Sequence, residues 1–375
     1  DQSYFNYATG LTMTNDKFDK LFGGPPRKSE TKISQREMDL AASIQKVIED
    51  VVVKLAKRIA KDTDERNLCL AGGVALNCVA NGVLLREKIF EKIWIQPAAG
   101  DAGGALGAAL SGWYLHHKKE RKISSAIDAM KGSYLGPKFT DEEIEAELTV
   151  NGAKFKKLSN DDMINQVATA LTQEKTIGWV QGRMEFGPRA LGGRSIIADP
   201  RSPIMQKKLN LKVKFRESFR PFAPSVLRED VDKWFEHDTD SPYMLFVSDV
   251  KKDKRKSTSK EEDAFFGINR LNVQRSSVPA ITHVDYSARI QTVHKDTNPL
   301  YHAVISKFKE KTGCPILVNT SFNIRGEPIV CSPTDAFKCF MGTNLDILVI
   351  SNFLLIKTEQ NTPLKKNYEE QYELD

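Results

Sequence analysis

Long apolar runs are missing from this sequence of 375 residues. No stretch approaches the ~20 apolar residues that a helix needs to cross a bilayer. The first ten residues, DQSYFNYATG, have neither the basic start nor the apolar middle of a secretory signal. We therefore expect a globular protein that has no membrane partner and works in the cytoplasm.

Paired cysteines are missing as well. The chain has five cysteines, and they form no CxxC pair and lie in apolar or mixed stretches. This pattern predicts small buried thiols in a reducing compartment and argues against a disulfide framework.

The excess of positive over negative charge is small. Lysine and arginine number 55 against 49 aspartates and glutamates, which gives a net charge of +6. Most of it comes from scattered lysines, so nucleic acid is not expected as a partner, whereas small anionic substrates remain open. The chain does have a large apolar share, 40% of its residues, and its length allows two or three domains.

A pattern of strand, glycine turn and helix repeats in the first 130 residues. It follows an amphipathic helix predicted over 34–61, which Ser34 and Glu37 open with a capping box. The first unit is the apolar run LCLA, two glycines and a helical pattern over 74–85. The second is the strand KIWIQ, the turn PAAGDAGG and the helix ALGAALSGWYLHH. Such repetition is typical of layered α/β folds, and we place a domain boundary near residue 130.

The remainder, 131–375, is predicted to form a second α/β domain. A helix near 162–174 and the strand TIGWVQG precede four β-like runs, SPYMLFVSDV, AITHVDYSARIQTV, CPILVNTSF and DILVISNFLLIK. A charged insert, KKDKRKSTSKEEDAFFG, interrupts these runs and is expected to be a surface loop.

Both glycine turns of the first part lie where a ligand could approach the backbone. Gly72 and Gly73 leave the chain free of Cβ atoms, and Asn77 is predicted one turn into the next helix, within reach of a base or ribose. Taken alone, this turn is explained more readily as a tight strand-to-helix crossing. Asp101 follows the next strand, where open α/β sheets bind ligands. It could hold a metal bound to phosphate oxygens or could cap the helix.

Arginines gather in the second part among glycines, prolines and phenylalanines. GRMEFGPRALGGRSIIADPRSP carries Arg189 and Arg194, KVKFRESFRPFAP carries Lys214 and Arg220, and HVDYSARIQTV carries Arg289. Arginines held on rigid turns bind phosphate or carboxylate groups through two parallel hydrogen bonds. The set therefore predicts an anion site, with plain salt bridges as the alternative.

A polar cluster follows an apolar strand in NTSFNIRGEP. Its members include Asn319, Ser321 and Asn323. Polar side chains at this density at a strand end predict a pocket for an oxyanion.

Six motifs resemble, in order and spacing, the carbamoyltransferase family of nodulation proteins and antibiotic-tailoring enzymes such as tobramycin and cephamycin carbamoyltransferases. They are LCLAGGVALNCVANGVL, PAAGDAGGALGAAL, FGPRALGGRSIIADPR, FRPFAPSVL, HVDYSARIQTV and NTSFNIRGEPIV, and the similarity covers nearly the whole chain. The resemblance implies the second half of an actin/sugar-kinase-like domain over 1–130. It implies a threonylcarbamoyl-AMP synthase-like domain over 131–375.

The resemblance also implies an ATP-dependent O-carbamoyltransferase. Such an enzyme forms carbamoyl-adenylate from carbamoyl phosphate and ATP, and passes the carbamoyl group to a hydroxyl of a small acceptor such as a sugar or an antibiotic. A divalent metal, iron or magnesium, would be its further cofactor. The resemblance assigns catalysis to Arg189, Arg194, Lys214, Arg220 and Arg289, substrate and nucleotide binding to Gly72, Gly73, Asn77, Asn319, Ser321 and Asn323, and the metal to Asp101.

One departure concerns the amino-terminal part. Family members carry, before the point where this chain starts, another half of the first domain with an H-x-x-x-H pair for the metal, whereas no histidine here precedes His116. We therefore expect an adenylate-forming domain beside an incomplete transfer site. The oligomeric state stays open, a homodimer included.

Two other functions compete with this one. A catalytically incomplete nucleotide- or tRNA-binding relative of the threonylcarbamoyladenosine machinery would account for the charge of +6 and the lysine-rich insert. A sugar or acetate kinase would share the first domain but leave the arginine-rich second part unexplained.

Overall fold

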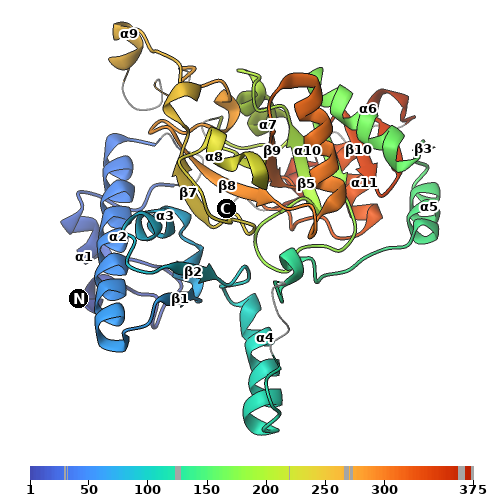
Figure 1. The fold of residues 1–375 in the computed structure, drawn as a ribbon. Helices are drawn as coiled ribbons and strands as arrows, with labels where there is room; N and C mark the ends of the chain where they lie inside the picture. The colour runs from blue at the N-terminus through green and yellow to red at the C-terminus, as the bar shows by residue number, and fades with distance from the viewer. Residues whose placement is uncertain are drawn as a thin grey trace.

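Two sheets of very different size organise the chain (Figure 1). The computed structural model describes residues 1–28, 31, 33–122, 128–218, 220–265, 270, 273–361 and 368–372. Within these residues, β1 and β2 form a two-stranded parallel sheet, and nine further strands form one mixed sheet. The expected α/β class is confirmed.

The small sheet belongs to the amino-terminal part, where a long helix comes first. The capping box of Ser34 and Glu37 is present at its start, as predicted. The elements here are α1 (Asp16–Leu21), α2 (Gln35–Thr63), β1 (Asn67–Leu70), the 3-10 helix η2 (Gly73–Leu76), α3 (Cys78–Arg86), β2 (Lys92–Ile95), α4 (Ala102–Ser111) and the π-helix η3 (Gly112–His116).

The large sheet has the strand order β3-β11-β10-β4-β5-β9-β6-β8-β7. Its neighbours run antiparallel except for the β10–β4 and β6–β8 pairs, which are parallel. Its strands are β3 (Lys156–Lys157), β4 (Ile177–Val180), β5 (Arg194–Ala198), β6 (Ala223–Leu227), β7 (Phe246–Asp249), β8 (Ser287–Val293), β9 (Ile316–Ser321), β10 (Ile347–Ile350) and β11 (Phe353–Ile356).

Helices pack on this sheet and enclose the main core. α10 packs on α6 and contacts β6 and β9, whereas α11 contacts α5, β4 and β10. The buried Trp179 of β4 donates from Nε1 to the Gly192 carbonyl at 3.0 Å and lies beside Tyr301 of α10. The helices are α5 (Asp141–Val150), α6 (Asn160–Thr172), α7 (Met205–Lys212), α8 (Val231–Trp234), α9 (Lys260–Asp263), α10 (Pro299–Thr312) and α11 (Pro333–Gly342).

The amino-terminal part contacts the large sheet through α3, which packs on β7. The buried Asn81 donates from Nδ2 to the Leu245 carbonyl at 3.1 Å. Next to it, a Cβ at Gly82 would lie 2.4 Å from the Val247 carbonyl oxygen. Glycine at 82 therefore lets the helix approach the strand closely.

Helix α4 is mostly exposed, and Leu106 is its side chain that packs against a buried hydrophobic cluster. The helix projects from the body in Figure 1, and none of its side chains is buried. Among the exposed residues at its end is Trp113, at 53% of its full exposure. Among the described residues, no helix is long and apolar enough to cross a lipid bilayer.

Most predicted elements are present, and the helices α5, α10 and α11 were not predicted. The helix expected over 74–85 is broken, because Asn77 ends η2 and begins α3. β5 and β6 were not expected, since both lie in the arginine-rich motifs that we predicted to be turns. The small sheet's strands precede residue 130 and those of the large sheet follow it, while the domain boundary itself stays a prediction.

Candidate functional site

A cavity of about 310 Å³ opens where β9 ends and β6 begins. Four arginines line it, and the end of β9 contributes residues 319–321. Among the described residues, no acidic side chain lines it. The arginines are Arg189, Arg216, Arg220 and Arg289.

The strand order of the large sheet brings these arginines together. β9 lies between β5 and β6, so that Asn319 pairs with Ile197 on one side and with Ala223 on the other. β8 pairs with β6 in a register that puts Gln291 opposite Ser225. Arg289, two residues earlier on β8, therefore comes level with the start of β6.

The loop between α7 and β6 supplies two further arginines. Arg216 donates from Nε to the Asn210 Oδ1 at 2.7 Å, and its guanidinium lies over the Phe222 ring, 5.1 Å from the centroid. Arg220 forms an ion pair with Glu217 at 3.0 Å. These contacts orient both guanidinium groups before any ligand arrives.

The positive charges in the cavity destabilise one another. Burial and the neighbouring Arg289 lower the pKa of Arg189 to about 10. Burial, with Arg220 next in importance, lowers the pKa of Arg216 to about 10 as well. Both remain protonated at neutral pH, and a bound anion would offset their repulsion.

Several polar atoms of this cavity are buried without a hydrogen-bond partner among the described residues. They are the Nε atoms of Arg189 and Arg289 and the Oδ1 of Asn319. Orphaned buried donors carry a free-energy cost of ~1–3 kcal/mol each. An anion with several oxygens would satisfy the two guanidinium donors.

A second hollow of about 360 Å³ adjoins the first and shares Arg216, Arg220 and Ser321 with it. Lys214 lies at its base and is buried. Its Nζ donates to the Ser321 carbonyl at 2.9 Å, and to the Asn323 carbonyl and Oδ1 at 2.7 and 2.6 Å. Burial, followed by the charge of Arg216, lowers the pKa of Lys214 to about 7.

Binding of inorganic pyrophosphate is expected to weaken as Lys214 loses its proton. Above its pKa of about 7 the amine is neutral, so one positive charge leaves the hollow. Calorimetry between about pH 6 and about pH 9 should show Kd rising about tenfold more in the native chain than in Lys214→Met. Lys214→Met is the control, because its pH dependence comes from the ionisation of pyrophosphate itself. Equal pH dependence in the two proteins would contradict the prediction.

Arg194 does not line the arginine cavity. Only 1% of it is exposed, and burial lowers its pKa. Its guanidinium donates to five backbone carbonyls at 3.0–3.4 Å, those of Cys331, Gln181, Gly182, Gly193 and Pro137. These contacts favour a structural role over the catalytic role expected from the sequence.

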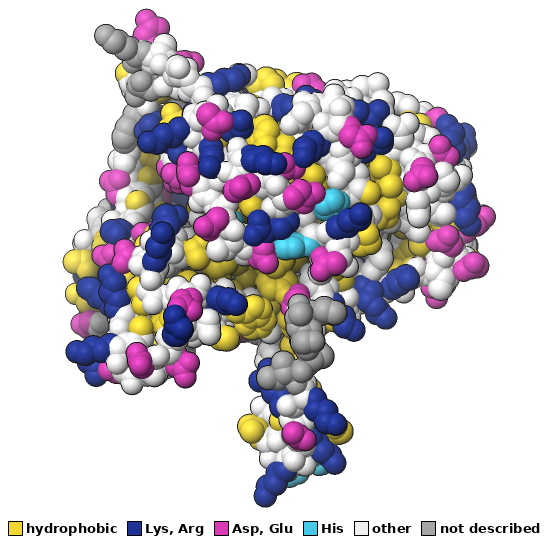
Figure 2. All heavy atoms as spheres, in the orientation of Figure 1, with side chains coloured by type: hydrophobic (Ala, Val, Ile, Leu, Met, Phe, Trp, Pro, Cys, Tyr) yellow, Lys and Arg dark blue, Asp and Glu magenta, His cyan; other side chains and the backbone are white. Residues whose placement is uncertain are grey.

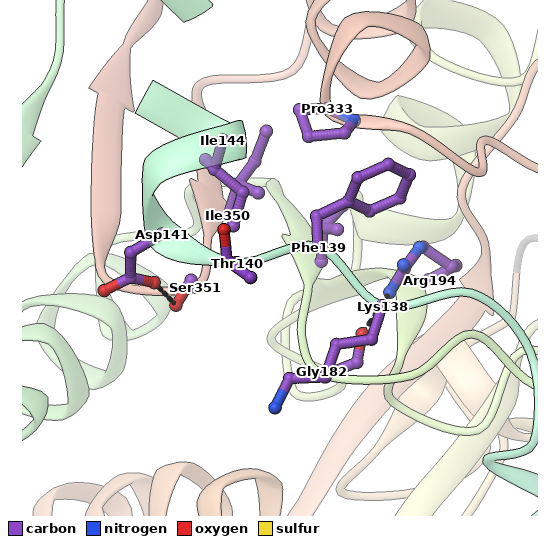
Figure 3. A pocket seen from close by; sticks show the side chains of 11 residues that line it. Lys138, Phe139, Thr140, Asp141, Ile144, Gly182, Arg194, Pro333, Ile350 and Ser351 are labelled. Carbon is purple, nitrogen blue, oxygen red and sulfur yellow. Dashed lines mark hydrogen bonds between the residues drawn. The ribbon is translucent and has the colours of Figure 1, made fainter. Parts of the chain in front are cut away.

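Arg194 instead borders a separate hollow of about 280 Å³, shown in Figure 3. Phe139 and Ile144 form part of its apolar wall, with Lys138 at one side. Asp141 accepts a hydrogen bond from the Ser351 hydroxyl at 2.9 Å. The one acid that lines this hollow among the described residues is therefore already paired.

The first glycine turn reaches the arginine cavity by an indirect route. Gly72 adopts φ +96°, and its N–H donates to the Ala99 carbonyl at 2.8 Å, which joins the two glycine turns. Gly73 begins η2. At the end of η2, the Leu76 carbonyl accepts from Arg189 Nη2 at 3.3 Å.

Asn77 occupies a different position from the one predicted. It caps α3, since its Oδ1 accepts from the Ala80 N–H at 3.1 Å, and its Nδ2 donates to Gln45 Oε1 at 2.9 Å. Its side chain therefore serves the local structure, and its predicted contact with a nucleotide stays a prediction.

Asp101 precedes α4 without capping it through its side chain. Within the described ranges, no group of three or more His, Cys, Asp or Glu residues is placed to hold a metal ion. The described residues thus do not complete a metal site around Asp101.

Two arginines join the residues predicted from the sequence. Arg216 lines both hollows, and Arg325 lines the second. Both belong to motifs already singled out, KVKFRESFRPFAP and NTSFNIRGEP. These motifs were themselves the signal, although the resemblance assigned no role to either arginine. The structure brings together Arg189, Arg220, Arg289, Lys214, Asn319, Ser321 and Asn323 around the paired hollows.

Two family models match this chain. The model described as the carbamoyltransferase N-terminus matches residues 1–110, and the one described as the carbamoyltransferase C-terminus matches residues 168–357. The second alone includes the arginine cavity and most of the large sheet.

Several curated proteins are similar to it. An uncharacterized protein of Synechocystis sp. is 57% identical over 378 residues, which cover 100% of this chain and 61% of that protein. Nodulation protein NolNO of Sinorhizobium fredii is 42% identical, over 88% of this chain and 46% of that protein. Nodulation protein U of Rhizobium fredii is 34% identical, over 74% and 41%. The chain spans about half the length of these relatives.

One solved structure is distantly similar. Full-length HypF in its phosphate- and nucleotide-bound form has a TM-score of 0.32 and 17% sequence identity, over 56% of this chain and 23% of that chain. A likeness at this level supports no statement about the present site.

Proposed function

Because this chain belongs to the carbamoyltransferase family, we propose that it takes part in ATP-dependent O-carbamoylation. Carbamoyl phosphate, ATP and one water give carbamoyl-adenylate, pyrophosphate and phosphate. The carbamoyl group then passes to a hydroxyl of a small acceptor of the sugar or antibiotic type, and AMP leaves. The cytoplasm is the proposed location.

The arginine cavity is the observation that carries this proposal. Both substrates of the first step are anions, and negative charge moves onto the departing pyrophosphate as the new bond to the α-phosphorus forms. Four guanidinium groups line this cavity, no acid lines it among the described residues, and two of the Nε atoms have no partner there. These groups would neutralise that charge and position the phosphates for reaction.

Residues around the cavity receive separate roles in the proposal. Arg189 and Arg289 would bind phosphate oxygens, because both line the cavity and each has an Nε without a partner among the described residues. Lys214 would hold the turn of Ser321 and Asn323, to which its ammonium donates. Asn319 would receive a donor from the substrate at its orphaned Oδ1.

The finer description of the fold belongs to the same proposal. The small sheet with its glycine turns would be the second half of an actin/sugar-kinase-like domain, and the large sheet a threonylcarbamoyl-AMP synthase-like domain. Gly72, Gly73 and Asn77 would face the nucleotide during transfer. A divalent metal, iron or magnesium, would need ligands besides Asp101.

Release of pyrophosphate tests the proposal. The purified chain should release pyrophosphate from ATP only when carbamoyl phosphate is also present, as measured with a coupled pyrophosphatase assay. Omitting each substrate in turn gives the control. Release that is independent of carbamoyl phosphate, or no release together with no binding of either substrate, would overturn it.

The alternative of a tRNA-binding relative gains no support from the face in Figure 2. There, Lys and Arg side chains are interspersed with Asp and Glu across the surface. A basic stripe of one sign is typical of nucleic-acid binding and is not seen on this face.

A further inference from the structure

We propose that the carboxyl-terminal tyrosines Tyr368 and Tyr372 are positioning residues of the anion site and act on it through Glu327. The inference rests on the proposed function, because the site that they support is the arginine-lined pair of hollows. It concerns a segment that none of the six sequence motifs includes.

The turn over 321–327 is the part of the site that these tyrosines hold. It follows β9, and Ser321, Asn323 and Arg325 on it line the second hollow. Glu327 closes the turn, because its Oε2 accepts from the Ile324 N–H at 2.7 Å and its carbonyl accepts from Asn323 Nδ2 at 2.6 Å. Glu327 therefore determines where these side chains lie.

The other carboxylate oxygen of Glu327 is held by the carboxyl-terminal segment. The hydroxyls of Tyr368 and Tyr372 both donate to Oε1, the latter at 3.2 Å. The two rings lie edge to face, with centroids 5.7 Å apart. Burial raises the pKa of each tyrosine, so both hydroxyls remain donors at neutral pH.

The ring of Tyr368 is packed in the main core. Tyr368 is only 6% exposed. At Gly342, the end of α11, an added Cβ would collide with the Tyr368 ring. The ring is thus fixed by packing, and its hydroxyl is delivered to Glu327 in one orientation.

The negative charge of Glu327 means that its hydrogen bonds to the two tyrosines affect anion binding in the second hollow. Glu327 is 8% exposed and borders the second hollow, where Lys214 and three arginines lie. Without the two hydroxyl donors, Oε1 would be a buried anionic acceptor with cations close by. The carboxylate would then turn towards those cations and compete with a bound anion.

Binding of inorganic pyrophosphate to the full chain tests this inference without relying on catalysis. In the double variant Tyr368→Phe/Tyr372→Phe, calorimetry should show Kd rising about tenfold, because two hydrogen bonds to a charged group are lost. Adding Glu327→Gln to the double variant should restore Kd to within about threefold of the native value, since the competing charge is gone. Tyr7→Phe, at an exposed hydroxyl of the amino-terminal part, is the control.

The outcomes separate this inference from the proposed function. An unchanged Kd in the double variant, or a raised Kd that Glu327→Gln leaves raised, would overturn the inference, since a merely structural role of the tyrosines predicts no rescue. A native chain that binds no pyrophosphate would instead overturn the anion site itself. Far-UV circular dichroism of every variant checks that each is folded.

Discussion

Replacing Arg289 with methionine is expected to lower the rate of pyrophosphate release by a factor of about 10²–10³. Arg289 lines the cavity, and its buried Nε has no partner among the described residues. The Arg289 side chain is half-buried and would therefore offer its guanidinium to a phosphate in a partly desolvated site. Methionine keeps much of the side chain's volume and removes both the charge and the donors, so the loss reports on charge stabilisation.

Steady-state kinetics with both substrates measures this effect as kcat/KM. Arg289→Lys should recover only part of the rate, because an ammonium cannot form two parallel bonds to one phosphate. Arg228→Met is the matched control, since the Arg228 guanidinium pairs with Asp240 and lies outside the cavity. Equal rates in the Arg289 and Arg228 variants would refute the assignment.

Replacing Arg194 with methionine is expected to lower the free energy of unfolding by about 3 kcal/mol or more. The five carbonyls that its guanidinium holds would each lose a donor, and Arg194 itself is only 1% exposed. The free energy of unfolding of Arg194→Lys should lie between those of the native chain and of Arg194→Met. The three donors of a lysine cannot serve five acceptors that are arranged around a planar group.

Urea denaturation followed by circular dichroism gives the change in stability. Below the transition, the folded fraction of Arg194→Met should bind pyrophosphate with a Kd within about threefold of the native value, since Arg194 lies outside the arginine cavity. A variant of native stability that fails to bind would restore the catalytic role predicted from the sequence.

Local patterns were sufficient to predict α2, α4, α6 and several strands, whereas α5, α10 and α11 were not predicted. α2 was predicted from its apolar spacing and the capping box of Ser34 and Glu37, both of which are properties of a single turn. The local sequence of β5 and β6 instead predicted turns. Two glycines precede β5, and Pro224 lies inside β6, although proline is rare within a sheet. Their strand pairing is decided by contacts with β9 that are distant in sequence.

The composition of the site could be predicted, but its geometry could not. Arginine, glycine and proline in the same motifs indicate an anion site wherever those motifs fold together. Which arginine enters the cavity depends on the strand order β5-β9-β6-β8. Arg194 and Arg189 share one motif, yet one serves backbone carbonyls and the other lines the cavity.

The link between Glu327 and Tyr368 had no local signal at all. The two residues are 41 positions apart, and neither belongs to a periodic pattern. Only the packing of Tyr368 against the end of α11 shows that its hydroxyl meets this carboxylate.

The exposed helix α4 determines how these variants have to be compared. Its sequence is almost entirely apolar, and none of its side chains is buried. Dyes that fluoresce on apolar surface will therefore bind the folded chain, so a melting curve recorded with such a dye would start from a high signal and hide the transition. The same surface favours adsorption to plastic and to hydrophobic resins. Stability should accordingly be followed by backbone ellipticity at low protein concentration.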